Sequence, residues 1–463
     1  MAVVAGSGAP TRWHRSWNDE KRGTIRSVAL HLHAHYRAML LDPEAGGDEV
    51  AAVLAPSDRT KDPPLFIPDS RQAWARLALA LVIGSIGSVG MWSVVVVLPV
   101  VQGEFGATRG DVSLAFTLNM LGFGLGGVVA GKITDRFGII MAIGISAAIL
   151  APGYIGAGLS TTLWQFILIH FLIGLGTSAT FGPLMAEASH WFDRYRGLAV
   201  TVAASGNYVG GMIWSPLLNW GIQSFGWRWS YIAVGIFCGV AMAAALLLLR
   251  ARIGGATRRS HVDAPPPRID LRLPINTLTA LLCVASIACC VAMAMPQVHI
   301  VAYCGDLGYG AARGAEMLSL MLAFGIISRI GSGFLADRIG GIRTLLIGSV
   351  AQGSALVFYL FFDSLSSLYI ISAMFGLFQG GIVPSYAIII RESMPASEAA
   401  TRVGIVILAS VFGMSFGGWV SGVIFDATGS YAAAFLNGLV WNAINATIVL
   451  ALLLRARPRW MMA

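Results

Sequence analysis

The sequence predicts an all-α polytopic membrane protein with twelve transmembrane helices, arranged as two similar sets of six. Three observations predict this fold: an apolar composition, a series of segments of membrane-spanning length, and an internal repeat. Of the 463 residues, 56% are hydrophobic and only 12% are charged, and the mean hydropathy is +0.73. A soluble chain carries about twice that share of charged residues. The composition therefore excludes an ordinary soluble domain.

Apolar runs of about 20 residues, the length that crosses the hydrocarbon core, recur from Trp74 onward. We place the first six spans at residues 74–101, 111–131, 139–159, 162–187, 197–222 and 228–250. The second six are placed at residues 275–303, 313–335, 342–362, 366–390, 402–425 and 431–454. The segment between the two sets is polar and contains three consecutive prolines, so we expect a solvated linker.

These spans divide the chain into five parts: an extension at 1–73, a first half at 74–251, a linker at 252–274, a second half at 275–457 and a tail at 458–463. The extension is polar and of mixed charge, which favours disorder, and it shows no secretory signal pattern. His31, His33 and His35 alternate within it. An extended segment could turn all three toward one metal ion, but a disordered tail is the expectation.

Lysine and arginine are distributed unequally between the two sides of the predicted spans. One side carries most of them, and the other carries only Arg109, Arg228 and Arg313. Because positive residues concentrate on the cytoplasmic side, both termini and the linker are predicted to be cytoplasmic. The net charge of +8 is explained by these loop residues, so no nucleic-acid partner is expected.

Several kinds of functional site are not indicated by the sequence. The five cysteines show no spacing typical of a disulfide framework or a zinc site. No nucleophile–base arrangement suggests an enzyme, and no phosphate-binding loop suggests ATP as an energy source. We therefore expect a protein that is not an enzyme and holds no metal or cofactor.

Short segments of the first half recur in the second. "GKITDRFG" (Gly131–Gly138) ends the second span, and "GFLADRIG" (Gly333–Gly340) ends the eighth, displaced by 202 residues. "IGLGTSATFGP" in the fourth span likewise resembles "FGLFQGGIVP" in the tenth. Parallel six-helix repeats joined by a loop are typical of one class of secondary transporters. On these motifs the chain resembles the major facilitator superfamily over roughly residues 74–457.

The resemblance implies a gating role for the repeated loop motif, which in the family is a latch on the cytoplasmic side. The residues concerned are Gly131, Asp135, Arg136, Gly138, Gly333, Asp337, Arg338 and Gly340. We expect the first glycine of each copy to let neighbouring helices approach closely, and each acid to face a helix N-terminus or an arginine. The alternative is that these residues only anchor helix ends and form turns.

Three longer segments resemble the monocarboxylate-porter branch, including its bacterial oxalate/formate-type relatives. They are "WFDRYRGLAVTVAASGNYVGG", "MPQVHIVAYCGDLGYG" and "ISRIGSGFLADRIGG". This resemblance implies transport of small carboxylates, with Arg329 as the anion partner. The chain departs from the branch at three positions. Animal members carry an aspartate four residues before this arginine, where this chain has Gly325, and they carry a lysine in the first span that this chain lacks. Oxalate exchangers carry a lysine in the eleventh span, which is uncharged here. Neither proton-linked lactate transport nor dicarboxylate exchange therefore carries over directly.

Arg329 is the strongest single candidate for substrate binding. It precedes Asp337 by about 12 Å of helix, at 1.5 Å per residue, which places it near the middle of a core about 30 Å thick. A charge at that depth costs at least about 2.5–3.5 kcal/mol on insertion scales. The planar guanidinium suits a carboxylate, so substrate binding is favoured over a structural role on backbone carbonyls.

Further polar side chains in the spans are candidates either for substrate binding or for interhelical hydrogen bonds: His170, Asn119, Asn207, Tyr208, Gln297, His299 and Tyr386. His170 is also a candidate proton carrier, because histidine titrates near neutral pH and the span cores contain no Asp or Glu. Aromatic residues that could wall a cavity, although most membrane aromatics only pack, are Trp92, Phe123 and Trp214.

The favoured function is secondary active transport of small organic anions, above all monocarboxylates, by alternating access. We expect a monomer in a bacterial inner membrane. Its expected partners are a small carboxylate substrate and the lipid bilayer, and also a proton if transport is coupled to one. One alternative is an exporter of amphipathic or aromatic acids or drugs. Another is a non-transporting membrane sensor that uses the first 70 residues as an output segment.

Overall fold

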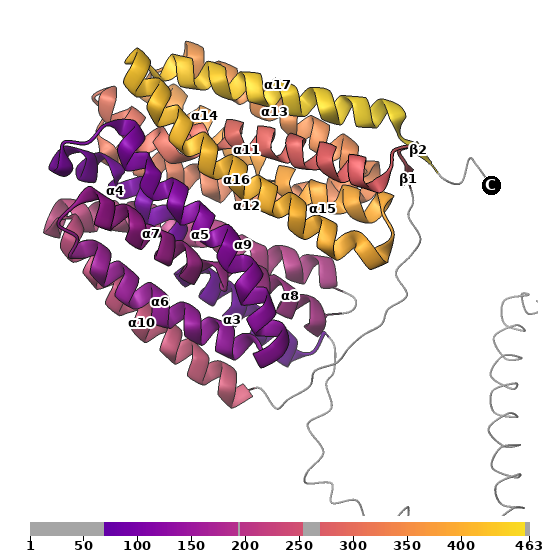
Figure 1. Ribbon diagram of the computed structural model, residues 1–463, viewed down its shortest axis with the longest axis horizontal. Coiled ribbons are helices and arrows are strands. Elements are labelled where there is room, and N and C mark those ends of the chain that lie inside the picture. Colours follow the sequence, from indigo (N-terminus) through magenta and orange to yellow (C-terminus); the bar gives the residue numbers. More distant parts are fainter. Residues whose placement is uncertain (1–68, 193–194, 253–268, 459–463) are drawn as a thin grey trace, which may run out of the picture. The chain divides into compact units, whose positions relative to one another are not determined.

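The computed structural model describes residues 69–192, 195–252 and 269–458 (Figure 1). These residues form a bundle of long helices and one short two-stranded ribbon. The predicted N-terminal extension, with His31, His33 and His35, and most of the predicted linker lie outside the described residues.

The first half contains eight helical segments: α3 (Arg71–Gly87), α4 (Val89–Phe105), α5 (Arg109–Phe137), α6 (Ile139–Gly158), α7 (Leu163–Ser178), α8 (Gly182–Trp191), α9 (Arg196–Phe225) and α10 (Trp227–Arg252). Helices α3 and α4 continue one another across Ser88, and α7 and α8 continue across residues 179–181. Each of these pairs makes one membrane-length rod with a break in it.

The second half contains seven helical segments: α11 (Ile275–Asp306), α12 (Ala311–Ile339), α13 (Gly341–Phe361), α14 (Leu365–Gln379), α15 (Ile382–Ser393), α16 (Ala396–Thr428) and α17 (Tyr431–Arg455). Helices α14 and α15 again form one broken rod. Strand β1 (Ile269–Asp270) pairs antiparallel with β2 (Arg457–Pro458). The ribbon joins the end of the linker to the end of the last helix.

Among the described rods, eleven are long and apolar enough to cross a membrane, judged by length and composition. The remaining rod is α9, whose sequence carries several glycines and the polar pair Asn207 and Tyr208. Because α9 packs against α3 and α4 of its own half and against α12 of the other, its polar positions face protein rather than lipid. The predicted all-α fold, with twelve membrane helices in two six-helix repeats, is confirmed.

The two halves repeat in packing as well as in sequence. Helices α12, α13 and α14 each begin 202 residues after α5, α6 and α7. A Cβ built on Gly174 would lie 2.0 Å from the carbonyl oxygen of Asn119, and one built on Gly376 would lie 2.0 Å from that of Met321. These two contacts are related by the same displacement. At each crossing only a bare backbone fits.

The turns that follow α5 and α12 are equally alike. Gly138 has φ 84° and ψ 165°, and Gly340 has φ 85° and ψ 161°. A positive φ of this size favours glycine strongly. The last glycine of each motif copy is therefore explained by backbone geometry.

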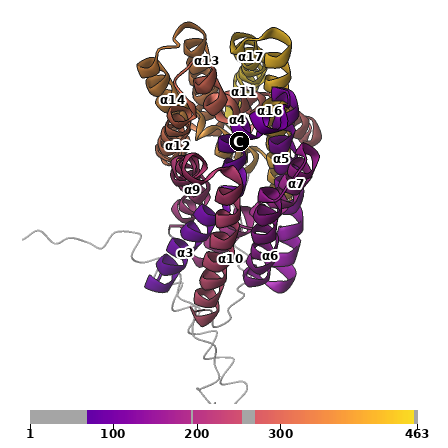
Figure 2. The ribbon, with the colours of Figure 1, turned by 90° about the vertical axis from the view of Figure 1, so that its left-hand side faces the viewer.

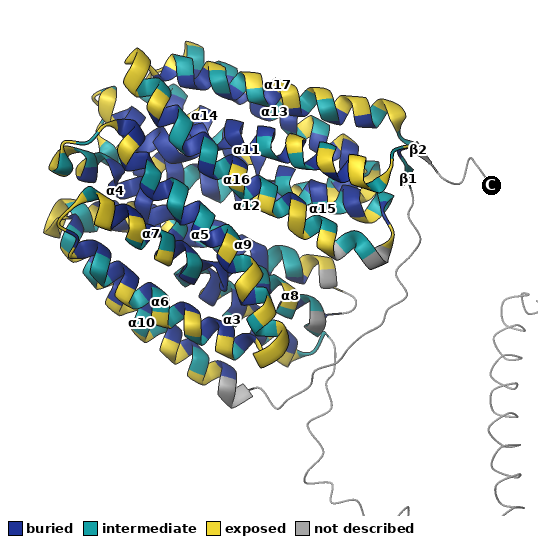
Figure 3. Cartoon of the chain, in the orientation of Figure 1, coloured by how far each residue is buried: buried dark blue, intermediate teal, exposed yellow. Residues whose placement is uncertain are grey.

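The halves meet along two pairs of helices, α5 with α16 and α9 with α12. The first half lies below in Figure 1, in indigo to magenta, and the second half lies above it, in orange and yellow; Figure 2 shows the same arrangement from the side. Exposed residues gather on the outer helix faces (Figure 3), where large apolar side chains such as Leu125, Val240 and Ile347 would contact lipid. We call the end that carries residues 131–138 and 333–340 the motif end, and the opposite end the Arg109 end.

We predict that Gly174→Leu destabilises the bundle, because its side chain would have to displace the backbone of α5. Overpacking of a core typically costs about 1–3 kcal/mol. Gly127→Leu on α5 is the matched control, since a Cβ there meets no heavy atom within 4 Å. Thermal unfolding in detergent, followed by intrinsic fluorescence, should show a lower midpoint for the first variant. Equal midpoints would contradict the packing account.

Candidate functional site

Arg329 lies within α12 at the surface where the two halves meet. The residue is buried, with 8% of its surface exposed. Its Nη1 donates to the carbonyl oxygen of Ala204 on α9 at 2.9 Å, and its Nε donates to that of Gly380, after α14, at 3.5 Å. Its guanidinium carbon lies 4.2 Å from the centre of the Tyr208 ring. Arg329 and the predicted candidate Tyr208 are therefore in contact, across the two halves.

Gly325 makes the contact between Tyr208 and Arg329 possible. A Cβ at position 325 would lie 2.9 Å from Cε2 of the Tyr208 ring. Any side chain there, including the acid that animal monocarboxylate porters carry, would displace the ring. Tyr208 thus takes the space of an acidic partner and presents its π face to the cation, a favourable but weaker contact than a carboxylate.

Arg329 has no carboxylate partner among the described residues. The ion pairs of the described chain are formed by other arginines, namely Arg76, Arg109, Arg228, Arg313 and Arg402. The hydrogen bonds of Arg329 use Nε and Nη1, which leaves Nη2 without an acceptor in this part of the chain. A buried cation without a counterion is costly. The arrangement can therefore receive a planar anion, because it offers a free donor and an unneutralised charge.

A small cavity of about 10 Å³ lies in the first half, beside the breaks in two rods. It is lined by Gly84, Ser88, Met91, Phe123, Thr177, Thr180, Phe181 and Asn207. Asn207 is fixed here because its Oδ1 and its carbonyl oxygen accept from Nε1 of Trp92 at 2.8 and 3.1 Å. Since Asn207 lies one helical turn from Ala204, the cavity adjoins the part of α9 that contacts Arg329. Of the predicted residues, Asn207 and Phe123 therefore line this cavity, and Trp92 bonds Asn207 beside it.

Two other predicted residues, Asn119 and His170, make their contacts inside the first half. Asn119 donates from Nδ2 to the carbonyl oxygen of Gly90 at 2.8 Å. His170 lies with Nδ1 2.8 Å from the carbonyl oxygen of Phe166 and Nε2 3.3 Å from the hydroxyl of Tyr231. The His170 ring is thus held between α7 and α10, away from the helices that join the halves. Substrate or proton binding by either residue stays a prediction.

Gln297 and Tyr386 lie inside the second half. Gln297 donates from Nε2 to Oε1 of Gln379 at 2.8 Å, and Nε2 of Gln379 is buried without an acceptor among the described residues. The hydroxyl of Tyr386 donates to Oδ1 of Asn445 on α17 at 2.9 Å. Sequence analysis missed Gln379, although it directly precedes Gly380, whose carbonyl oxygen bonds Arg329. Its position at the break of a rod was the available signal.

Trp214, the third aromatic candidate for a cavity wall, packs inside the first half instead. Its Nε1 donates to the carbonyl oxygen of Ser85 at 2.9 Å. Its ring meets that of Phe237 at a centroid distance of 5.6 Å. Trp214 therefore joins α9 to α3 and α10.

Charged groups join the two halves at the Arg109 end. Nη1 and Nη2 of Arg109, at the start of α5, lie 3.1 and 3.3 Å from the carboxylate oxygens of Asp306, at the end of α11. Nη1 also donates to the hydroxyl of Tyr431. The carboxylate of Asp426 accepts the backbone N–H groups of Arg109 and Gly110 at 2.9 and 2.5 Å. Asp426 thereby caps α5 from the opposite half.

At the motif end, no described hydrogen bond or ion pair joins the halves. The charged motif side chains are all exposed: Asp135, Arg136, Asp337 and Arg338. The close helix approach expected at Gly131 and Gly333 is absent, because a Cβ on either residue would meet no heavy atom within 4 Å. Hydrogen bonds between the described halves run from the Arg109 end to Arg329. The bundle is therefore joined at the Arg109 end, and the gating role of the motif stays a prediction.

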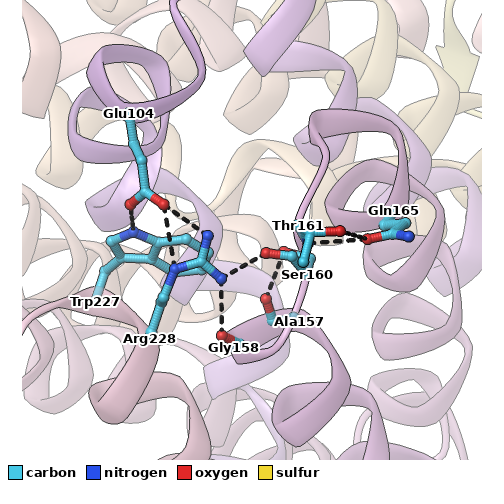
Figure 4. Close-up of polar contacts among 8 residues, drawn as sticks. All are labelled: Glu104, Ala157, Gly158, Ser160, Thr161, Gln165, Trp227 and Arg228. Atoms are coloured by element: carbon cyan, nitrogen blue, oxygen red, sulfur yellow. Dashed lines mark hydrogen bonds and ion pairs between the residues drawn. The ribbon is translucent and has the colours of Figure 1, made fainter.

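A second charged cluster at the Arg109 end braces the first half internally (Figure 4). Glu104, at the end of α4, accepts from Nε and Nη2 of Arg228 at 3.1 and 2.6 Å, and from the indole N–H of Trp227. Nη1 of Arg228 donates to the carbonyl oxygens of Gly158 and Ser160 at 3.1 and 2.5 Å. These bonds tie α4, α6 and α10 together, so that this half can move as one body.

Comparison with known proteins identifies the family. The family model for the Major Facilitator Superfamily matches residues 80–365 and 332–460. The chain belongs to the Major Facilitator Superfamily. Monocarboxylate transporter 13 of Rattus norvegicus is 25% identical over 391 residues, which cover 80% of this chain and 86% of that protein. The Agnestins efflux protein AgnL12 of Paecilomyces divaricatus is 25% identical over 327 residues, which cover 70% of this chain and 73% of that protein.

Solved structures show the same fold. The crystal structure of the nucleoside transporter NupG superposes with a TM-score of 0.66 at 12% sequence identity, and covers 83% of this chain and 99% of that one. A bacterial homologue of the human lysosomal transporter Spinster gives a TM-score of 0.62 at 14% identity, with coverage of 84% and 96%. At these identities the likeness shows the fold alone.

Family membership makes this protein a multi-pass membrane transporter with a small-molecule substrate, and its relatives are transporters rather than enzymes. The resemblance to monocarboxylate porters is confirmed at the level of relatives. These relatives are mammalian and fungal, so the relation to bacterial oxalate/formate-type proteins stays a prediction. Within the described residues no group of His, Cys, Asp and Glu side chains could hold a metal ion.

We predict that reversing one charge at the Arg109 end separates the halves there. Arg109→Asp and Asp306→Arg each place like charges together, while the double variant restores an opposite pair. The distance between spin labels attached across this end should lengthen in both single variants and return toward the wild-type value in the double variant. A double variant as open as either single one would show that the ion pair does not hold the halves.

Proposed function

We propose that this protein is a secondary transporter of small organic monocarboxylates, and that Arg329 binds the substrate carboxylate. The observation that carries the proposal is a buried arginine between the two halves with no acidic partner among the described residues. The first half offers it a backbone carbonyl and an aromatic face, both neutral. The negative charge that would complete this site is therefore supplied by the substrate.

Substrate binding on Arg329 would act directly on the contact between the halves. A carboxylate forms charge-assisted, two-pronged hydrogen bonds with a guanidinium that a neutral carbonyl cannot match. It would therefore replace the carbonyl of Ala204 as the acceptor for Nη1. Of the hydrogen bonds between the described halves, the bond from Arg329 to α9 lies farthest from the Arg109 end. Loss of this bond would remove one of the contacts that keep the halves joined at the Arg109 end.

The distribution of positive charge assigns the two ends to the two sides of the membrane. The motif end carries most of the lysines and arginines, so the positive-inside rule makes it cytoplasmic. Because the hydrogen bonds between the described parts of the two halves lie from the Arg109 end to Arg329, this proposal takes the bundle as an inward-facing state in which Arg329 is approached from the cytoplasm. We place the protein as a monomer in a bacterial inner membrane, with both termini in the cytoplasm.

We predict that Arg329→Lys sharply lowers uptake of radiolabelled monocarboxylates into proteoliposomes, because lysine keeps the charge but loses the fork. Hydrogen bonds to charged groups are worth about 1.5–3 kcal/mol, which corresponds to a fall in kcat/KM of roughly tenfold to a hundredfold. Arg313→Lys is the matched control, since Arg313 lies on the same helix but is exposed and pairs with Glu316 at the Arg109 end. Wild-type uptake by the Arg329 variant would sink the anion-fork proposal.

Export of larger amphipathic or aromatic acids is the second candidate function, since one relative is named an efflux protein. The same arginine would serve either direction. The test is an uptake assay in vesicles with a panel of small carboxylates, run with and without an imposed pH gradient. We predict that only the small monocarboxylates of this panel accumulate. Exclusion of these compounds together with active extrusion of an aromatic acid would favour the exporter.

A further inference from the structure

His299 is a buried histidine directly beneath the charged cluster that joins the halves. It lies on α11, about two helical turns before Asp306, and it is fully buried. Its Nε2 lies 2.8 Å from the carbonyl oxygen of Gly418 on α16. Its ring centroid lies 5.8 Å from that of Tyr431, whose hydroxyl accepts a hydrogen bond from Arg109.

These contacts determine which form of the imidazole fits. A carbonyl oxygen only accepts hydrogen bonds, so Nε2 must carry a hydrogen. Nδ1 is buried and has no hydrogen-bond partner among the described residues. A proton on Nδ1 would therefore create a buried donor without an acceptor and a buried positive charge. While the halves are joined, His299 fits only as the neutral imidazole.

The groups that face the ring reinforce this restriction. The charged groups that act on His299 are Arg109 of α5 and Asp426 of α16. Arg109 has the same sign as a protonated imidazole, whereas Asp426 is already engaged by two backbone amides of α5. Tyr431 of α17 and Tyr303 of α11 complete the cluster with neutral rings. None of these groups forms a hydrogen bond with Nδ1.

Separation of the halves would change the surroundings of His299 in the direction that favours a protonated imidazole. His299, Gly418 and Tyr431 all belong to the second half, whereas Arg109 belongs to the first. Phe116, also of the first half, packs on Gly418, since a Cβ there would lie 2.7 Å from its Cδ1. When the halves part at this end, Arg109 and Phe116 leave together, while the bond of His299 to Gly418 lies within the second half and remains. Opening would remove the repelling charge and let water enter beside Gly418 and His299.

We propose that His299 is a proton-binding site that links external acid to opening of the Arg109 end. The open state binds one proton on Nδ1, and the joined state requires that proton to leave. By linkage, a rise in proton concentration on that side favours the open state. The proposal rests on the proposed function only in that the two ends open in turn, and it holds whichever anion is carried.

The experiment measures opening against pH without any substrate. Spin labels are attached to the purified full-length chain in lipid nanodiscs through Ser224→Cys on α9 and Ser366→Cys on α14. Both positions are exposed at the Arg109 end, one in each half. The five native cysteines are replaced in this background. Between about pH 8 and pH 5, the range in which a hydrated imidazole takes up its proton, the ratio of open to joined molecules should rise by up to about tenfold per pH unit.

Two histidine variants separate His299 from other causes. His299→Gln keeps a donor for the Gly418 carbonyl but does not titrate, so its distance distribution should not change with pH. His170→Gln tests the other candidate proton carrier, because His170 is equally buried but has a partner at each ring nitrogen. It should keep the wild-type response; a lost pH response in this variant would assign the effect to His170 and overturn the proposal. A wild-type slope in His299→Gln would overturn the proposal.

The wild-type titration decides the matter even if His299→Gln fails to fold. A distance distribution that does not change with pH overturns the proposal. So does a response confined to pH values below about 5, where carboxylates titrate, because it would assign the effect to a carboxylate and not to the imidazole. Failure of the transport proposal is distinguishable. Absent carboxylate uptake with intact pH-dependent opening overturns only the substrate, whereas active uptake with pH-independent opening overturns only His299.

Discussion

The carboxylate of Asp426 accepts the first two amide N–H groups of α5, a helix of the opposite half, and this bond sets the geometry of the whole junction. A helix N-terminus needs acceptors and favours negative charge, so α5 is held where α16 ends. Arg109, the first residue of α5, is thereby brought to Asp306 and Tyr431. At the other end of the bundle, the charged side chains of both motif copies are exposed.

Arg329 lies at the limit of this junction, and its environment is suited to an exchange of partners. A buried cation needs compensation, which the Ala204 carbonyl and the Tyr208 ring supply in part. An acid at position 325 would have supplied more, but the Tyr208 ring occupies that space. In the proposed function, this partial compensation would let a substrate carboxylate displace the carbonyl. Full neutralisation from within the chain would leave the substrate little to gain.

The parts of this structure that follow from local sequence were predictable, and those that depend on distant pairs were not. Span lengths and the 202-residue repeat both follow from hydropathy and spacing. The junction could not be found in this way, because Arg109 bonds partners 197 and 317 residues away, and no local pattern marks such a pair. His170 was chosen for its chemistry, yet its bonds to Phe166 and Tyr231 are set by packing between α7 and α10. The sequence does not indicate which conformation the protein adopts either. The close helix approach expected at Gly131 and Gly333 is absent from the observed conformation.

The repeat also shows where the two halves stop being equivalent. The glycine crossings at Gly174 and Gly376 preserve the scaffold, but the residue 202 positions before Arg329 is Gly127. The buried arginine therefore belongs to one half, and the other half presents a backbone carbonyl and an aromatic ring to it. In a transporter whose arginine had a neighbouring acid, that acid would be the obvious place for a coupling proton. With glycine at position 325, no such group stands beside Arg329 among the described residues. At the Arg109 end, His299 has a buried ring nitrogen without a partner among the described residues and lies beside the cluster that joins the halves, which is why the proposed proton site is placed there.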